Sequence, residues 1–260
     1  MTPESIIRLK ELLPTAMGSE EYRENIAGDI LRRSIITARM ESAHFLKRLR
    51  EVCTEFAAGE KDRGTAIADL GSLLEQMGHS PQDGGGIANP ASERRLRLIL
   101  DTQRQMAASV ARISEQTSST AYLWPAWELA RLGTRQRPRT NWAERWRAAG
   151  ESVGWEGALP SRVGGRMIAL KSSPIWQALG NGEGGYTDTL GNPYPPFAYN
   201  SGLDWDEVDR DECVALGLIA PDEDVSAPAP QSLAPDGLEM QDAAARYGFT
   251  ADDFKVEVSA

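Results

Sequence analysis

The stretch "GNPYPPFAYNSG", residues Gly191–Gly202, decides how the second half of this chain folds. It holds three prolines, three aromatic residues and four Gly or Asn residues in twelve positions, and no acid, base or usual nucleophile. Proline fixes φ near about −65° and removes a backbone donor, so a stiff, extended segment is predicted, which we call the strap. Its aromatic side chains then have fixed directions in which to bury. We expect the strap either to close a folded module or to dock on a partner, through Pro195, Pro196, Phe197 and Tyr199.

The strap belongs to an aromatic-rich part of the chain, residues 117–220. All seven tryptophans lie between positions 124 and 205. Short apolar runs, "AWELARL" and "RMIAL", are separated by Gly and Pro and predict short strands. "TNWAERWRAAG" predicts a helix that ends at Gly150, and "DRDECVALGLI" predicts another that Asp209 caps. The expected fold is a small α+β module with a short antiparallel sheet.

The first half of the chain, residues 1–116, has helical periodicity instead. Apolar residues recur at helical spacing through "NIAGDILRRSIITARMESAHFLKRLREVCTEFAAG", which predicts one long helix over residues 25–58. A second helix is expected over 65–77, before Gly78, and a third from about residue 91 to 116. An antiparallel helical bundle follows, so the overall class is α+β and mainly α.

The acidity of the protein is concentrated in residues 221–260. This segment holds nine acids and two bases, whereas the formal charge of the whole chain is −10. It opens with "PDEDVSAPAPQSLAPDG", a composition typical of a linker. We therefore expect an acidic linker and C-terminal tail that the fold of the module does not need.

The usual signals of catalysis and metal binding are not found in the sequence. Two histidines, His44 and His79, have no metal or triad spacing, so we expect them to have structural roles. The two cysteines, Cys53 and Cys213, are expected to be packed side chains. "DWDEVDRDE" gathers six carboxylates but lacks the central Gly of a calcium loop, so helix capping is favoured over a metal site. From the composition of the sequence we expect no export signal and no membrane segment. We expect no enzyme activity, no cofactor and a cytoplasmic site of synthesis.

One charged segment stands out. Residues 131–147 hold six arginines and a single acid, Glu144, with Trp142 and Trp146 among them. Arginine beside aromatic surface suits an acidic protein partner or a phosphate backbone, and a solvated face that offsets nearby acids is an equally open interpretation. A protein partner is favoured over DNA because no recognised nucleic-acid module is present. The candidate partner-binding residues are Arg131, Arg135, Arg137, Arg139, Arg145 and Arg147.

The order of these features resembles the head morphogenesis, or minor head, proteins of tailed bacteriophages, the phage Mu F-like group. The resemblance covers about residues 25–220. It is carried by the helical first half, the helix "RRLRLILDTQRQMAASVAR", the segment "RLGTRQRPR", the strand-like "GRMIALKSSPIW" and the strap.

Two motifs of that family can be aligned. Its Asp-x-Arg-Thr-Arg-Pro-x-His segment matches Arg135, Arg137 and Pro138, with Gly133 and Thr140 in place of the Asp and His. Its closing Pro-Pro-x-x-x-x-Cys-Arg-Cys segment matches at Pro195 and Pro196, and Asn200, Ser201 and Gly202 stand where its cysteines would be. The Asp, His and Cys side chains that this chain lacks are those suited to metal or redox chemistry. Their replacement leaves a structural role of the two motifs intact.

The resemblance implies a virion component present in few copies and associated with the portal vertex. Its implied partners are the portal protein and other phage head proteins, with DNA as a further contact and no membrane. The implied location is the host cytoplasm during assembly and then the capsid. Two alternatives stay open: an ADP-ribosyltransferase-like toxin, for which "EQTSSTAY" and "KVEVSA" are poor matches to the required motifs, and a nucleic-acid-binding packaging factor.

Overall fold

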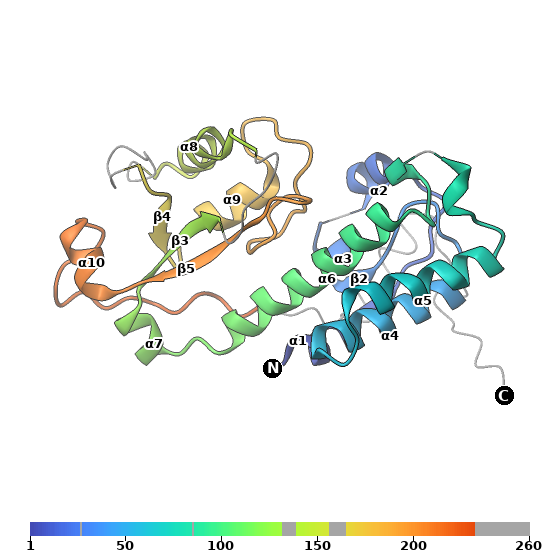
Figure 1. The fold of residues 1–260 in the computed structure, drawn as a ribbon. Coiled ribbons are helices and arrows are strands. Elements are labelled where there is room, and N and C mark those ends of the chain that lie inside the picture. Colours follow the sequence, from blue (N-terminus) through green and yellow to red (C-terminus); the bar gives the residue numbers. More distant parts are fainter. Residues whose placement is uncertain (27, 85, 132–138, 156–164, 232–260) are drawn as a thin grey trace. The chain divides into compact units, whose positions relative to one another are not determined.

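A computed structural model describes residues 1–231 except 27, 85, 132–138 and 156–164 (Figure 1). The chain divides at Ala111 into two compact units, and within the described residues these are Met1–Ala111 and Arg112–Gln231. The first unit is mainly helical and the second has a three-stranded antiparallel sheet with a buried aromatic cluster, which confirms the predicted fold class. No helix in the described part of the chain is long and apolar enough to cross a membrane.

The first unit is built from helices and one pair of two-residue parallel strands. Its elements are α1 (Pro3–Arg8), β1 (Glu11–Leu12), α2 (Ser19–Asn25), α3 (Gly28–Arg33), β2 (Ser34–Ile35), α4 (Ala43–Ala58), α5 (Arg63–Gln76) and α6 (Glu93–Ser114), the last of which continues into the second unit, with short 3₁₀ turns at Pro81–Asp83 and Gly86–Ala88.

Helices α4 and α5 form a hairpin whose ends follow capping rules (Figure 1). The Ser42 hydroxyl accepts a hydrogen bond from the Phe45 N–H at the start of α4, and Gly59 ends that helix at φ 76°. Asp62 caps α5 by accepting from the Thr65 N–H. The predicted second helix is thereby confirmed, and so is the third, as α6.

The prediction of one long helix over residues 25–58 is wrong. The chain forms α2, α3 and β2 before α4 begins, because Ser34 and Ile35 pair with β1 and Arg39 takes a left-handed φ of 55°. The side chain of Arg95 holds the intervening loop, since its Nη2 donates to the Thr37 hydroxyl at 2.8 Å and to the Ala38 carbonyl. Periodicity alone could not show these long-range contacts.

A fully buried lysine lies in the core of the first unit. The Nζ of Lys10 donates to Oε1 of Gln103 at 2.7 Å, and Arg50 donates to the Lys10 carbonyl. Burial lowers the pKa of the Lys10 amine to about 7, because removal from water disfavours the charged form. Burial likewise raises the pKa of the nearby Cys53 thiol to about 12.

This lysine predicts a pH dependence of stability. Between about pH 7 and 10 the unfolded chain keeps a proton on Lys10 that the folded chain has released, so the free energy of unfolding rises with pH, by at most about 1.4 kcal/mol per unit from this group. Lys10→Met should lose this rise between pH 7.5 and 9.0 in urea unfolding. The exposed Lys47→Met is the control and should follow the wild-type profile. An unchanged profile in Lys10→Met would contradict the assignment.

The second unit surrounds a sheet with strand order β4-β3-β5. Its elements are α7 (Ser118–Leu123), β3 (Ala126–Arg131), α8 (Trp142–Ser152), β4 (Ile168–Leu170), α9 (Ile175–Asn181), β5 (Leu203–Val208) and α10 (Arg210–Ala215). The predicted strands and both predicted helices are confirmed. However, α8 runs past Gly150, and β5 was not predicted because its acids resemble a helix-capping segment.

One face of the sheet carries large aromatic side chains. Trp127 and Trp205 lie on β3 and β5, and their rings stack with centroids 3.7 Å apart. Helices α8 and α9 lie on this side and contribute Trp146 and Trp176, whose rings meet edge to face at 5.3 Å (Figure 1). These four tryptophans and Phe197 of the strap are called the aromatic cluster below.

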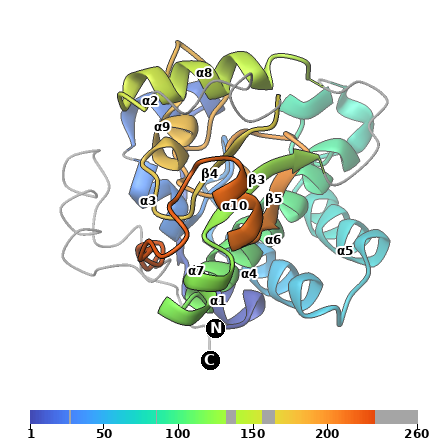
Figure 2. The same ribbon diagram turned by 90° about the vertical axis from the view of Figure 1, so that its left-hand side faces the viewer.

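The other face is covered by α10 and by the start of the acidic segment (Figure 2). Ala126, Ile168 and Val208 pack there with Cys213 of α10, and Val225 packs against the same cluster. The start of the predicted acidic linker therefore contacts the folded unit through Val225. Residues 232–260 of the predicted tail lie outside the described residues.

Candidate functional site

The strap is an internal part of the second unit. The side chains of Tyr194 and Phe197 are fully buried, and Pro195 and Pro196 are buried beside them. The peptide bond between the two prolines is cis. The segment folds back on itself, since the Leu190 N–H donates to the Phe197 carbonyl at 3.0 Å. Tyr199, the last predicted strap residue, is only partly buried.

Phe197 connects the strap to the aromatic cluster. Its ring stacks on Trp176 at a centroid distance of 6.0 Å and meets Trp205 edge to face at 6.2 Å. Pairs of aromatic rings in such geometries contribute about 0.5–1.5 kcal/mol beyond the burial of their area. The strap therefore supplies one wall of the core of this unit.

A glycine lets the strap lie directly against α9. The Gly191 N–H donates to the Gly180 carbonyl at 2.9 Å. A Cβ atom at Gly180 would lie 1.8 Å from the carbonyl oxygen of Asn192, so only glycine allows this approach of two backbones. The Asn192 amide in turn donates to the Pro196 carbonyl at 3.0 Å.

Two of the predicted arginines, Arg139 and Arg145, bind the same carboxylate, that of Asp188. The buried Arg145 of α8 makes two bonds to Asp188, Nη1 to Oδ1 at 2.7 Å and Nη2 to Oδ2 at 3.1 Å. Arg139 also donates to Asp188, and its Nη2 donates to the Tyr199 carbonyl of the strap at 2.8 Å. The guanidinium of Arg145 further lies over the ring of Tyr186, 4.3 Å from its centroid.

The electrostatics of Asp188 follow from these partners. Burial alone would raise the pKa of this carboxyl, but the hydrogen bonds from Arg145 and the charges of Arg139 and Arg145 outweigh it and lower the pKa. Asp188 therefore stays ionised and holds both arginines in place.

The remaining candidate arginines differ in their surroundings. Arg131 and Arg147 are exposed, and Arg131 donates to the Arg139 carbonyl at 3.2 Å. Arg135 and Arg137 lie outside the described residues. The predicted arginine cluster is thus divided into an internal pair, Arg139 and Arg145, and at least two residues at the surface.

We expect Asp188→Ala to lower the free energy of unfolding by about 2 kcal/mol. Removing one member of a buried ion pair costs about 3–5 kcal/mol, and the value is smaller here because 36% of the Asp188 side chain is exposed. The control is Asp101→Ala, which breaks an exposed pair with Arg63 and should cost less than about 1 kcal/mol. Equal losses in urea unfolding would show that the Asp188 pair is merely a surface contact.

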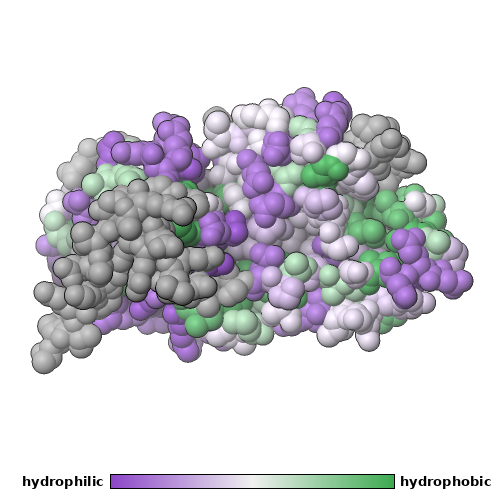
Figure 3. Space-filling view, turned by 180° about the vertical axis from the view of Figure 1, so that it is seen from behind, coloured by the Kyte–Doolittle hydropathy of each residue, from purple (hydrophilic) through white to green (hydrophobic). Residues whose placement is uncertain are grey.

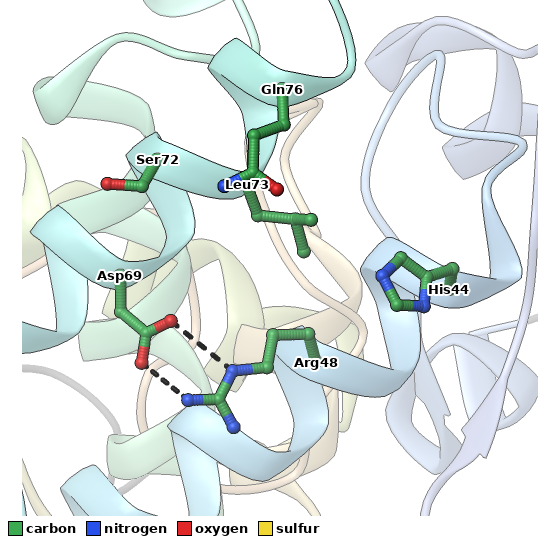
Figure 4. Close-up of a pocket in the computed structure, with 6 residues that line it drawn as sticks. All are labelled: His44, Arg48, Asp69, Ser72, Leu73 and Gln76. Carbon is green, nitrogen blue, oxygen red and sulfur yellow. Dashed lines mark hydrogen bonds and ion pairs between the residues drawn. The ribbon is translucent and has the colours of Figure 1, made fainter.

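A second region considered as a site is a surface depression of about 400 Å³ between α4 and α5. Arg48 and Asp69 line it as a directly bonded pair, with Arg48 Nη2 donating to Asp69 Oδ2 at 2.5 Å, and Figure 4 shows the His44 ring apart from this pair. Lys61 also contacts Asp69 at 2.5 Å. The arrangement is an ion-pair network that joins two helices, and the exposed His44 side chain of α4 lies beside it.

The other candidate chemical residues are also accounted for. Cys53 and Cys213 are buried, unpaired thiols, and burial raises the pKa of Cys213 to about 11. Asp209 caps α10 by accepting from the Glu212 N–H at 2.8 Å, as predicted. Instead of returning a capping-box bond, the Glu212 side chain pairs with Arg166. Among the described residues, no group of three His, Cys, Asp or Glu side chains is placed to hold a metal ion.

Sequence reasoning missed the two residues that fix the strap, Asp188 and Gly180. Asp188 lies in "GYTDTLGN", where it has the appearance of an ordinary turn acid, and Gly180 looks like a helix-ending glycine. The excess of arginine in residues 131–147 was the one available signal that an internal acid was needed. Comparison of the chain with protein-family models, with curated proteins and with solved structures finds no significant match.

Proposed function

We propose that this chain is a non-enzymatic minor head protein of a tailed bacteriophage or prophage, which acts in head morphogenesis at or near the portal. The observation that supports the proposal best is that three of the segments carrying the resemblance, the arginine-rich segment, "GRMIALKSSPIW" and the strap, contact one another in the second unit. Arg139, from the arginine-rich segment, donates to the strap at Tyr199, and Trp176, from "GRMIALKSSPIW", stacks on Phe197 of the strap. These segments are far apart in the sequence, so their contact fits a shared structural module.

The unit has the properties that a component of a large assembly needs. Its core is fixed by stacked rings and by ion pairs, so little ordering is required when a partner binds. In the proposed role, Arg139 and Arg145 maintain the strap, and the exposed Arg131 and Arg147 contact the portal or another head protein. The phosphate backbone of DNA is the second anionic surface that Arg131 and Arg147 are suited to bind.

The structure offers less support for the two alternative functions, an ADP-ribosyltransferase-like enzyme and a nucleic-acid-binding packaging factor. An ADP-ribosyltransferase-like enzyme needs a Ser-Thr-Ser strand, and Ser118, Ser119 and Thr120 form the start of helix α7. The segment "KVEVSA" lies outside the described residues. A packaging factor that uses all six arginines would need Arg139 and Arg145, which are committed to Asp188.

The proposal is tested by mass spectrometry of purified heads of the phage that encodes the chain. We expect the protein in the particles at low copy number relative to the capsid protein, and co-purification with the portal ring. Arg131→Ala/Arg147→Ala should weaken that co-purification, and Arg97→Ala, which removes another exposed arginine, should not. Nuclease treatment separates DNA-mediated from direct contact. Absence of the protein from both heads and portal fractions would overturn the proposal.

A further inference from the structure

The last two residues of helix α7 and the residue after it carry three consecutive large apolar side chains that are exposed. The exposed fractions are 44% for Tyr122, 52% for Leu123 and 42% for Trp124. In contrast, the tryptophans of the aromatic cluster are buried in the same unit. A contiguous exposed group of this kind marks an interaction site more often than scattered apolar residues do, and Trp and Tyr are the residues most enriched in binding hot spots.

Arg210 fixes this apolar group at Tyr122. The guanidinium lies over the Tyr122 ring, 3.8 Å from its centroid, and Nε donates to the Tyr122 carbonyl at 3.2 Å. The two terminal nitrogens donate to the carbonyls of Pro221 and Glu223 at 3.3 and 2.5 Å. The end of α7, the start of α10 and residues 221–223 therefore form one preorganised surface, and Arg210 is occupied by internal contacts.

The same surface is strongly acidic. Arg210 is the single base in residues 209–224, and the acids on either side of its contacts are exposed. Figure 3 shows hydrophobic and strongly hydrophilic residues next to each other over the α10 region of this unit. The acidic aromatic patch consists of Tyr122, Leu123, Trp124, Asp209, Asp211, Asp222, Glu223 and Asp224.

We propose that the acidic aromatic patch binds a basic amphipathic segment of a protein partner. Apolar side chains of that segment would cover Leu123 and Trp124, and its Lys or Arg side chains would face the acids. Charge complementarity selects this occupant, because exposed acids repel both the phosphates of nucleic acid and the anionic headgroups of a membrane. The inference deepens the proposed function by naming the chemistry of one partner, at a surface separate from the arginines of α8.

The test uses a short fluorescent peptide with Leu at helical spacing and Lys at the other positions, titrated with the full chain. We expect Leu123→Ser/Trp124→Ser to weaken binding about thirtyfold or more, which corresponds to the loss of one hot spot. Asp222→Asn/Asp224→Asn should weaken it severalfold and reduce its salt dependence. Ile87→Ser removes an exposed apolar side chain elsewhere, and Glu20→Gln/Glu24→Gln removes exposed acids elsewhere, so these controls should bind as the wild type does.

Each other outcome overturns the inference. If the patch variants and the control variants bind the peptide with equal affinity, the attraction is non-specific. If a peptide with Glu in place of Lys binds the wild-type chain equally well, charge plays no role in the binding. Binding to phosphatidylcholine–phosphatidylglycerol vesicles instead of the peptide would assign the patch to a membrane. Self-association that the patch variants abolish would assign it to a second copy of the chain. The two proposals fail separately. A negative peptide result would not change whether the protein is found in phage heads, and absence of the protein from heads would not change the peptide result.

Discussion

Replacing Phe197 with Ala should lower the free energy of unfolding by about 3–5 kcal/mol. The ring is fully buried and contacts Trp176 and Trp205, so its removal takes away burial energy and leaves a cavity in the aromatic cluster. The rigid prolines next to it prevent the strap from collapsing into that space. Urea unfolding followed by tryptophan fluorescence measures the effect, because the rings that report it surround the substituted site.

The control for this prediction is Trp124→Ala. Trp124 is larger than Phe197 but 42% exposed, so its removal should cost less than about 1 kcal/mol. If Phe197→Ala leaves the unfolding midpoint unchanged, the ring does not support the core. If that same variant loses a binding partner, the strap is a docking element and not a closure.

Replacing Gly180 with Ala should destabilise the second unit by about 3 kcal/mol or more, at the upper end of the cost of overpacking. The added Cβ would lie 1.8 Å from the Asn192 oxygen and 2.6 Å from its carbonyl carbon. Both atoms belong to the backbone, so no side-chain rotation relieves the contact and the strap itself must move. We expect the Gly191–Gly180 hydrogen bond to break and the near-ultraviolet dichroism of the tryptophans to change.

Gly71→Ala is the matched control, because Gly71 also lies within a helix, α5. No heavy atom lies within 4 Å of a Cβ built there. The substitution should stabilise the chain by about 0.5–1 kcal/mol, since Ala has the higher helix propensity. A similar response of both glycine variants would show that propensity, and not the close approach of the strap, governs Gly180.

Much of the second unit follows from short patterns in the sequence. The short apolar run "AWELARL", the capping Asp209 and the burial of Phe197 among prolines are local features, and local features are what propensity and periodicity describe. Strand β5 was missed because its pairing to β3, not its own composition, makes it a strand. In the first half, apolar periodicity concealed the break at Arg39 for the same reason.

The candidate site shows the same limit in electrostatic terms. The sequence identifies a surplus of arginines, but the positions of the Arg139 and Arg145 guanidinium groups depend on a carboxylate more than forty residues away, Asp188. Arg145 therefore looked like a surface residue and is buried. Conversely, Leu123 and Trp124 are residue types that the sequence alone would place in a core, and only the structure shows that they are exposed.

Hydrogen–deuterium exchange of the strap tests most directly whether it closes the second unit. The Leu190 and Gly191 amides donate to Phe197 and Gly180, so they should exchange as slowly as the Leu129 amide of β3, which donates to Met167. Phe197→Ala should speed exchange at both strap amides. Exchange of the wild-type strap at the rate of a free peptide, while β3 remains protected, would contradict the closure.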